Sequence, residues 1–466
     1  MEFSSATFLF IFLPAVFLLY LIPVKPLRRA VLILASLVFY AWGDIRYVPL
    51  LLVSAAVNFV LALIIGKREG KNNRPLLAVA IVFNIGLLAF YKYLGFFIDS
   101  LGALFNAELS KPDILSPLGI SFFTFQSLSY IIDVSRGDAK HTENPFKFLL
   151  YISFFAQLTQ GPIIRFTQVE ASLDELKPTS QKAADGIRTF IFGLGMKLII
   201  ANTLGRVTDY IWSLDASCLN AAYAWTGALA FLLRIYFDFA GYSKMAVGLG
   251  LMFGIDIPEN FDHPYAALGM TDFWRRWHIT LSRWFRDYVY IPLGGNRRGA
   301  LRTGLNKITV FLLTGLWHGA NLTFVVWGAY NGVFLLAETY LKRTKLRFPK
   351  PIKWLYTILA VTVGFVIFNS PDLGYAFKMI GSMFAGFGIG ADTAAALSKL
   401  LRPTVIAVFI AAVIGASPLF AKIAEKLKNK PVALNILRYG SAAAVFILCL
   451  FFLASGNYNP SIYTQF

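Results

Sequence analysis

Residues 308–337 read ITVFLLTGLWHGANLTFVVWGAYNGVFLLA, and this stretch decides the fold class. Two apolar runs, residues 308–317 and 322–337, flank a single histidine, His318. An ionisable side chain at membrane depth is costly, so it tends to face a bundle interior or a water-filled cavity. Imidazole also suits proton transfer near neutral pH. The stretch therefore predicts membrane helices that enclose a chemical site.

The composition of the whole chain agrees with this prediction. Of the 466 residues, 57% are hydrophobic and only 15% are charged, which is typical of membrane proteins. Several runs are long enough to cross ~30 Å of hydrocarbon, which needs about 20 helical residues. The first 23 residues lack a basic segment and a cleavage site, so they are interpreted as a retained span. We expect an all-α polytopic membrane protein with roughly eleven spans.

The distribution of charge predicts the orientation. The net charge is +18, but the basic residues lie mostly in short segments between apolar runs, such as 67–74, 342–353 and 422–430. The positive-inside rule places such segments in the cytoplasm. The ends of the chain, residues 1–5 and 456–466, carry no basic residue, so both termini are expected outside. Membrane lipids are expected partners and nucleic acid is not.

Three parts of a single domain are distinguished by their pattern. N-terminal spans are expected in residues 1–110, an irregular core in 111–342 and C-terminal spans in 343–466. In the core, residues 112–134 are too polar for a helix that faces lipid, which predicts a re-entrant or buried segment. In residues 271–290, aromatic side chains recur at helical spacing on one face and cationic side chains on the other, which predicts one interfacial helix. That helix should end at the breaker cluster 292–296.

Two histidines are candidates for chemistry. Because Gly315, Gly319 and Asn321 surround His318, the helix is expected to break or bend there, within the membrane. His278 follows Trp277 in the arginine-rich segment, and two interpretations stay open for it. It is either a packed structural residue of an interfacial helix or part of the wall of a substrate channel.

A charged pair in another apolar stretch also has two interpretations. Arg234 and Asp238 lie four residues apart, which places an ion pair on one helix face. The pair is either a buried structural one or a charged wall for an anionic substrate. No nucleotide-binding loop, serine elbow or histidine metal motif is present in the sequence. We therefore expect no bound metal and no bound cofactor.

The segments around these residues resemble the membrane-bound O-acyltransferase family, and within it the branch that acetylates bacterial polysaccharides. The resemblance covers most of the chain, and it is weaker after residue 342. The matching segments are PLGISFFTFQ (117–126), QGPIIR (160–165), FDFAGYS (237–243), DFWRRWH (272–278), RDY (286–288), YIPLGGNR (290–297) and GLWHGA (315–320).

The resemblance implies a ring of transmembrane helices around a central tunnel in the bacterial inner membrane. It makes His318 the catalytic histidine and His278 the second histidine near the tunnel. Acetyl-CoA is the implied donor, and a polysaccharide or an extracytoplasmic acetyltransferase partner is the implied acceptor. The residues expected to line the tunnel are Trp317, Asn321, Arg276, Asp287, Gln126, Arg234 and Asp238. Two of them, Asn321 and Arg276, are also possible oxyanion donors.

A different class of function fits part of the same pattern. In a transporter or flippase of a lipid-linked glycan, the histidines would be proton relays or structural groups. Such a protein often has interrupted spans in two related halves. The sequence shows no internal symmetry of this kind. The transferase is therefore the favoured prediction.

Overall fold

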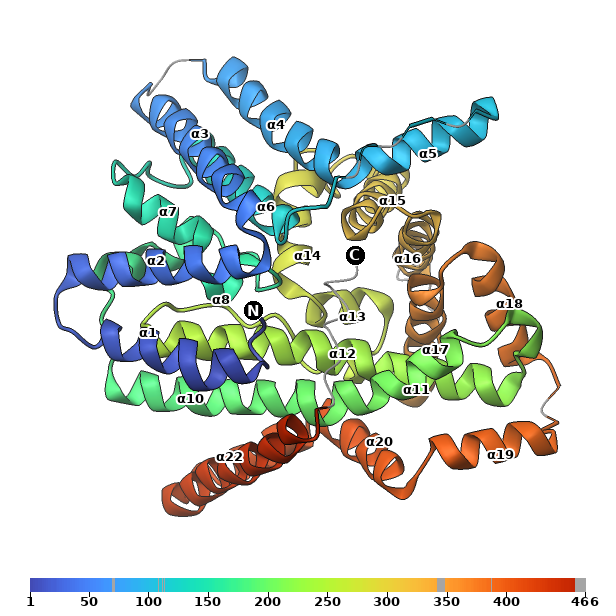
Figure 1. Ribbon diagram of the computed structural model, residues 1–466. Helices are drawn as coiled ribbons and strands as arrows, with labels where there is room; N and C mark the ends of the chain where they lie inside the picture. The colour runs from blue at the N-terminus through green and yellow to red at the C-terminus, as the bar shows by residue number, and fades with distance from the viewer. Residues whose placement is uncertain are drawn as a thin grey trace. The chain divides into compact units, whose positions relative to one another are not determined.

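The computed structural model describes residues 1–68, 72–107, 109–110, 112, 114–341, 348–386 and 388–456. Within these residues the protein is helical and has no strand. The predicted all-α class is thus confirmed. Figure 1 shows the helices. They divide into two compact units. Unit 1 consists of Met1–Phe190 and Tyr242–Glu259, and unit 2 consists of Ile191–Gly241 and Asn260–Phe466.

Unit 1 contains the N-terminal helices and the end of one long helix. Its helices are η1 (Phe8–Phe12), α1 (Leu13–Tyr20), α2 (Lys25–Asp44), η2 (Ile45–Tyr47), α3 (Val48–Lys67), α4 (Arg74–Leu88), η3 (Ala89–Tyr93), α5 (Leu94–Phe105), α6 (Ile120–Arg136), α7 (Pro145–Ser153), α8 (Phe155–Leu158), α9 (Phe166–Glu175), most of α10 (Ser180–Gly195) and the last part of α12 (Ala221–Met252).

Unit 2 contains the rest of α10 and α12 and the C-terminal helices. Its other helices are η4 (Met196–Ala201), α11 (Asn202–Trp212), η5 (Ala216–Cys218), η6 (Pro264–Ala266), α13 (Met270–Arg276), α14 (Ile279–Phe285), η7 (Arg286–Tyr290), α15 (Gly299–His318), α16 (Leu322–Leu341), α17 (Lys350–Asn369), α18 (Leu373–Phe384), α19 (Ala391–Leu400), α20 (Pro403–Ala416), α21 (Leu419–Lys426) and α22 (Pro431–Ala454). The predicted parts 1–110, 111–342 and 343–466 have different bounds, because the contacts that define a unit join segments far apart in the sequence.

The described residues include six helical segments long and apolar enough to cross a membrane. A seventh span results if α19 and α20, which meet at an angle of 73°, count as one. The estimate of eleven spans is therefore not confirmed. The expected first span is a shorter apolar helix, Phe8–Tyr20, and its buried aromatic rings pack inside unit 1. The basic segment 342–347 and residues 457–466, on which part of the orientation prediction rests, lie outside the described residues.

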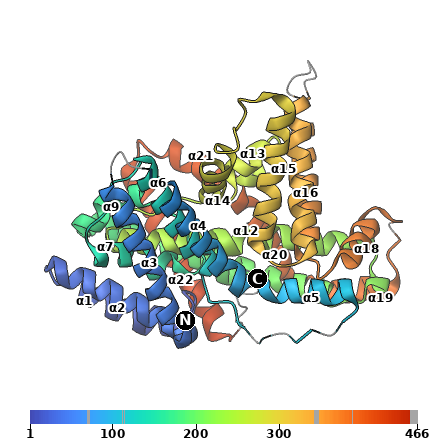
Figure 2. The same ribbon diagram turned by 90° about the horizontal axis from the view of Figure 1, so that it is seen from above.

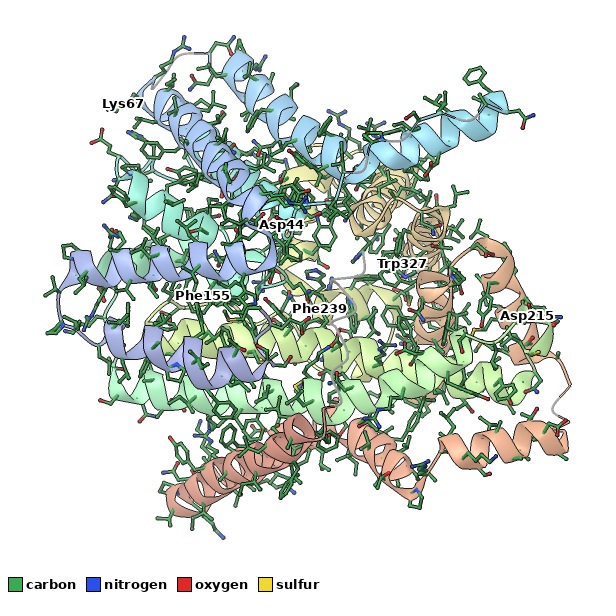
Figure 3. All side chains as sticks on the ribbon, viewed as in Figure 1. Asp44, Lys67, Phe155, Asp215, Phe239 and Trp327 are labelled. Carbon is green, nitrogen blue, oxygen red and sulfur yellow. The ribbon has the colours of Figure 1, made fainter. Side chains whose placement is uncertain are left out.

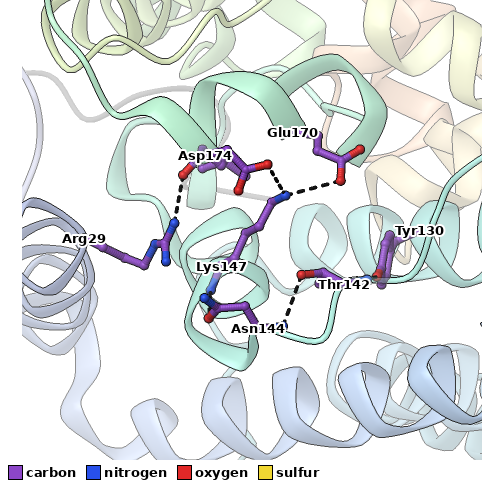
Figure 4. Close-up of polar contacts among 8 residues, drawn as sticks. Arg29, Tyr130, Thr142, Asn144, Lys147, Glu170 and Asp174 are labelled. Carbon is purple, nitrogen blue, oxygen red and sulfur yellow. Dashed lines mark hydrogen bonds and ion pairs between the residues drawn. The ribbon is translucent and has the colours of Figure 1, made fainter. Parts of the chain in front are cut away.

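Residues 120–134 of the polar segment belong to α6, a buried helix in unit 1. Fourteen of the seventeen residues of α6 are buried, which explains how it carries so many polar side chains. Beside it, the buried Lys147 of α7 lies 3.2 Å from Glu170 and 2.7 Å from Asp174 on α9 (Figure 4). The Lys147 ammonium also lies over the Phe166 ring. These contacts fix α9 against α7.

The helical hairpin of α15 and α16 dominates the part of unit 2 that carries His318. The two helices run side by side in both ribbon views (Figures 1 and 2). Glycines permit their close approach, since a Cβ atom at Gly315 would lie 2.2 Å from the Phe324 carbonyl oxygen. A Cβ atom at Gly328 would lie 2.3 Å from the Phe311 carbonyl oxygen. Small residues serve this purpose at helix contacts in membranes.

Candidate active site

His318 is the last residue of α15, at the closed end of the hairpin. The helix ends there because Gly319 adopts an extended conformation, and α16 begins three residues later. The predicted break at this histidine is confirmed. The other end of α15 is basic, with Arg298 preceding the helix and Arg302 in its first turn. The hairpin thus separates a basic open end from a closed end that carries the imidazole.

Aromatic rings surround the His318 side chain. The residue is only 6% exposed. The edge-on neighbours of its ring are Trp317, Trp327 and Phe368, at centroid distances of 5.0, 5.3 and 5.1 Å. Figure 3 labels Trp327, which comes from α16. Three elements of unit 2 therefore build a water-poor chamber around one imidazole.

His278 lies at a break in the segment that was predicted to be one helix. α13 ends at Arg276 and α14 begins at Ile279, so the prediction of a continuous helix over 271–290 is wrong. His278 itself has a left-handed backbone, with φ of 43°. The break divides the predicted helix into two short ones, and their aromatic residues Trp277 and Trp284 are buried in unit 2. The predicted stop at 292–296 is confirmed, since turns follow Tyr290.

Hydrogen bonds define the state of the His278 ring. Its Nδ1 lies 3.3 Å from Oδ1 of Asn260, which also accepts bonds from the Thr280 N–H and hydroxyl at 3.0 and 2.9 Å. An amide oxygen only accepts, so Nδ1 carries the hydrogen and Nε2 presents a lone pair. Among the described residues Nε2 has no hydrogen-bond partner. Burial lowers the pKa of His278 to about 3, so the ring is neutral at physiological pH.

Trp317 connects the two histidines. Its ring centroid lies 6.0 Å from that of His278 and 5.0 Å from that of His318. The His278 ring also packs edge-on against Phe239, with the ring centroids 4.6 Å apart. The structure therefore brings together His318, His278 and Trp317, three of the residues selected from sequence.

A cavity of about 300 Å³ lies along α15 in the same unit. Its walls include Lys307 and Thr314, and Thr314 precedes His318 by one helical turn. Trp274 also lines the cavity and packs at 5.6 Å against Trp327, which contacts His318. The complete lining is Thr271, Trp274, Arg275, Leu281, Ser282, Phe285, Arg286, Tyr290, Lys307, Val310, Phe311, Thr314 and Leu335. The cavity thus combines apolar walls with three cationic side chains.

Arg276 and Asp287 participate in local ion pairs. Arg276 Nε lies 2.9 Å from the Asp272 carboxylate, and its Nη1 lies 3.7 Å from that of Asp262. Asp287 pairs with Arg286 at 2.7 Å. Arg276 therefore fixes the segment before α13 rather than pointing freely into a tunnel.

Arg234 and Asp238 have ion-pair partners on other helices. Arg234 lies 2.5 Å from Asp209 of α11, and Asp238 lies 2.5 Å from Lys197 of η4. The expected pairing along α12 is thus replaced by pairing between helices. The Lys197–Asp238 pair is deeply buried, with side-chain exposures of 6% and 2%.

Asn321 and Gln126 have structural surroundings of different kinds. The Asn321 side chain caps the start of α16 at the Thr323 N–H and donates to the Pro371 carbonyl, at 3.1 Å in both bonds. It therefore stabilises the hairpin turn. Gln126 lies on α6 in unit 1 and is 1% exposed. Its Oε1 has no partner among the described residues.

Three features of the site were not identified from sequence. Asn260 carries no local motif, and its role depends on the fold that brings it to His278. The cationic lining of the cavity comes from three elements, α13, η7 and α15. Lys197 did have a signal, since it is a lone lysine within an apolar run. Among the described residues no three histidine, cysteine or acidic side chains gather at a possible metal site.

Comparisons with known proteins give the site a context. Residues 87–373 match the model of the MBOAT, membrane-bound O-acyltransferase, family. A protein of Pseudomonas putida named probable alginate O-acetylase is 38% identical over 100% of both chains. The peptidoglycan O-acetyltransferase of Helicobacter pylori is 34% identical over 83% of this chain and 80% of its own. The teichoic acid D-alanyltransferase of Bacillus subtilis is 32% identical over 54% of this chain and 67% of its own.

Proposed function

Because the chain belongs to the membrane-bound O-acyltransferase family, we propose that it transfers acetyl groups from a cytoplasmic thioester to an exported polysaccharide. The family makes it a multi-pass membrane enzyme of the acyltransferase class. Three relatives are named for the acylation of alginate, peptidoglycan and teichoic acid. Membrane O-acylation of a polysaccharide is therefore the activity supported best, and the transporter alternative loses its basis.

The observation that carries the proposal is the position of His318 at the closed end of a hairpin whose open end is basic. The basic end belongs in the cytoplasm by the positive-inside rule, which places the imidazole toward the other face. We assign the inner membrane as its location, with both termini outside. Donor and acceptor would then approach His318 from opposite sides.

His318 acts as the general base in the proposed reaction. Its neutral imidazole takes the proton of the acceptor hydroxyl while that oxygen attacks the thioester carbonyl. The tetrahedral intermediate collapses, the carbon–sulfur bond breaks and the new ester forms. The imidazolium returns the proton to the departing thiolate, so the products are an acetyl ester and a free thiol. General base catalysis of this kind contributes typically ~10²–10⁴-fold.

The cavity beside α15 is the proposed donor site. Acetyl-CoA carries a flexible arm with amide groups and several phosphates, and the cavity offers hydroxyl-bearing side chains together with Arg275, Arg286 and Lys307. Thr314, near the end of the lining, is one turn from His318, so the thioester would reach the imidazole from this side. The protein itself needs no bound cofactor in this proposal. An extracytoplasmic acetyltransferase or another polysaccharide-modifying protein is the proposed partner on the acceptor side.

The direct test replaces His318 by alanine and measures both the amount of protein in the membrane and the acetyl esters on the polymer. We expect normal abundance and a loss of acetylation of at least about 100-fold. His263→Ala is the matched control, because His263 lies in a turn against Asp262 and lines neither chamber nor cavity. Intact acetylation in the His318→Ala variant at normal abundance would refute the proposal.

A second experiment tests the donor site. Arg275→Gln with Lys307→Gln is expected to raise the KM for acetyl-CoA in purified protein, while kcat changes less, because the phosphates lose two cations. Arg302→Gln is the control, since Arg302 is exposed on the same helix and does not line the cavity. An unchanged KM would remove the cavity from the donor path. Failure of every thioester tried would contradict the transferase itself.

A further inference from the structure

A second cavity in unit 2, separate from the proposed donor site, is almost entirely apolar. It has a volume of about 510 Å³, within the range of sites that hold one small ligand. Its walls come from α12, η6, α17 and α20 and include Leu233, Trp354, Phe409 and Val413. None of the residues proposed for catalysis lines it. It requires an explanation of its own.

The polar side chains of this lining are all satisfied within the protein. The Tyr265 hydroxyl donates to the Leu232 carbonyl, and the Trp354 indole donates to the Tyr265 carbonyl at 2.9 Å. The Ser417 hydroxyl donates to the Ile414 carbonyl at 2.6 Å. The lining therefore offers no side-chain donor to a polar ligand, and it suits a hydrocarbon chain.

Three features place the mouth of this cavity at a membrane surface. Trp354 lies in the second turn of the candidate span α17 and is 45% exposed, as is typical of interfacial tryptophan. Lys350 and Lys353 precede it on the same helix. α21 begins directly after Pro418 of the lining, and none of its residues is buried.

The amphipathic character of α21 strengthens this placement. Its apolar residues Leu419, Phe420 and Ile423 share one face and are 36–60% exposed. Lys422 and Lys426 border this face on one side, and the carboxylate of Glu425 lies on the opposite face. A helix with this pattern and no protein cover lies in the boundary between headgroups and acyl chains. The cavity mouth therefore lies at acyl-chain depth, with lysines of α17 and α21 close to its lining residues in the sequence.

We propose that this cavity binds one acyl chain of an anionic glycerophospholipid. The chain occupies the space between α12, α17 and α20, while the phosphate lies at Lys353 and Lys422. Trp354 and Pro418 line the same cavity, and each is followed or preceded within a few residues by lysines, which attract anionic headgroups. A zwitterionic lipid would fill the same apolar space with weaker retention. The proposal does not depend on the acetyl transfer proposed above.

Native mass spectrometry of the purified full chain tests the proposal. The protein is incubated with phosphatidylglycerol or phosphatidylethanolamine of identical acyl chains, and lipid retention is measured as activation energy increases. We expect wild-type protein to retain phosphatidylglycerol longest. Val413→Trp fills the cavity from a position that is 60% exposed, so the retained lipid should be lost without unfolding. Ile410→Trp, 56% exposed on the same helix but outside the lining, should behave as wild type.

The charged mouth has its own variant. In the variant that combines Lys353→Gln with Lys422→Gln, both lipids should still bind. Phosphatidylglycerol should then be retained no longer than phosphatidylethanolamine. Equal retention by Val413→Trp and Ile410→Trp would overturn the acyl site. An unchanged headgroup preference in the lysine variant would overturn the anionic assignment. If lipid-free protein forms a dimer and Val413→Trp abolishes that dimer, the cavity is a contact site for a second copy of the chain. This result would also overturn the proposal.

Discussion

The Lys197–Asp238 ion pair allows a quantitative prediction about stability. Both side chains are buried, and their charged atoms are 2.5 Å apart. Lys197→Met leaves the Asp238 carboxylate in a low-dielectric interior without this cation. Removing one partner of a buried pair typically costs about 3–5 kcal/mol. Since about 1.4 kcal/mol corresponds to a factor of ten, the folding equilibrium should fall roughly 100- to 4,000-fold.

The matched control is the same substitution in an exposed pair. Lys182 lies 2.9 Å from Asp256, with side-chain exposures of 42% and 54%. Water screens this pair, so Lys182→Met should cost only about 0–1 kcal/mol. The two variants differ in burial and share the chemical change. A comparison between them therefore isolates the effect of burial.

The assay is equilibrium unfolding in mixed detergent micelles, followed by tryptophan fluorescence. The variant Lys197→Met with Asp238→Asn removes both charges and should recover most of the lost stability, because no unpaired charge remains. If Lys197→Met unfolds like wild type, the pair does not stabilise the fold. If the double variant is as unstable as the single one, the loss comes from packing and the electrostatic reasoning is refuted.

Other substitutions test the hairpin and the histidine site. Gly328→Ala should destabilise the protein by about 1–3 kcal/mol in the same assay, because the new methyl group meets the carbonyl of the facing helix. Gly440→Ala is the control and should not destabilise it, because open space surrounds Gly440. Equal stabilities of the two variants would contradict this prediction. Folded His278 stays neutral, whereas the unfolded residue binds a proton below about pH 6.5, so stability should fall by about 1.4 kcal/mol per pH unit as the pH decreases toward 3. His278→Gln should remove this component, and an unchanged slope would refute it. Asn260→Ala leaves two donors of Thr280 and the His278 ring without their acceptor, so acetylation per membrane-bound protein should decrease more than abundance does; an equal decrease of both would indicate a purely structural role.

Local features of the site were predictable where special residues mark them. The helix end at His318 was expected because two glycines and an asparagine surround it, and the structure places the end there. The break before His278 was missed, since neither glycine nor proline marks it. A non-glycine residue in the left-handed region is uncommon and is held by tertiary contacts, here including the bond to Asn260.

Contacts between distant segments were beyond the reach of sequence pattern. The spacing of Arg234 and Asp238 correctly fits one helix face, but it cannot identify Asp209 and Lys197, which come from other helices. The expected number of spans is not confirmed, because a count of apolar runs by length does not show where a helix is short or bent. Phe8–Tyr20 is shorter than a span, and α19 and α20 form a bent pair.

The hairpin that carries His318 has a consequence for how the enzyme enters the membrane. From residue 308 to residue 337, no aspartate, glutamate, lysine or arginine interrupts the sequence. Each such residue at the centre of a span would cost about 2.5–3.5 kcal/mol during insertion. The charge-free part of the hairpin, which joins residues 308–318 of α15 to the candidate span α16, can therefore insert at low cost, whereas Arg302 and Lys307 lie in the first half of α15. The imidazole would enter the bilayer within a segment that contains no acidic residue, lysine or arginine.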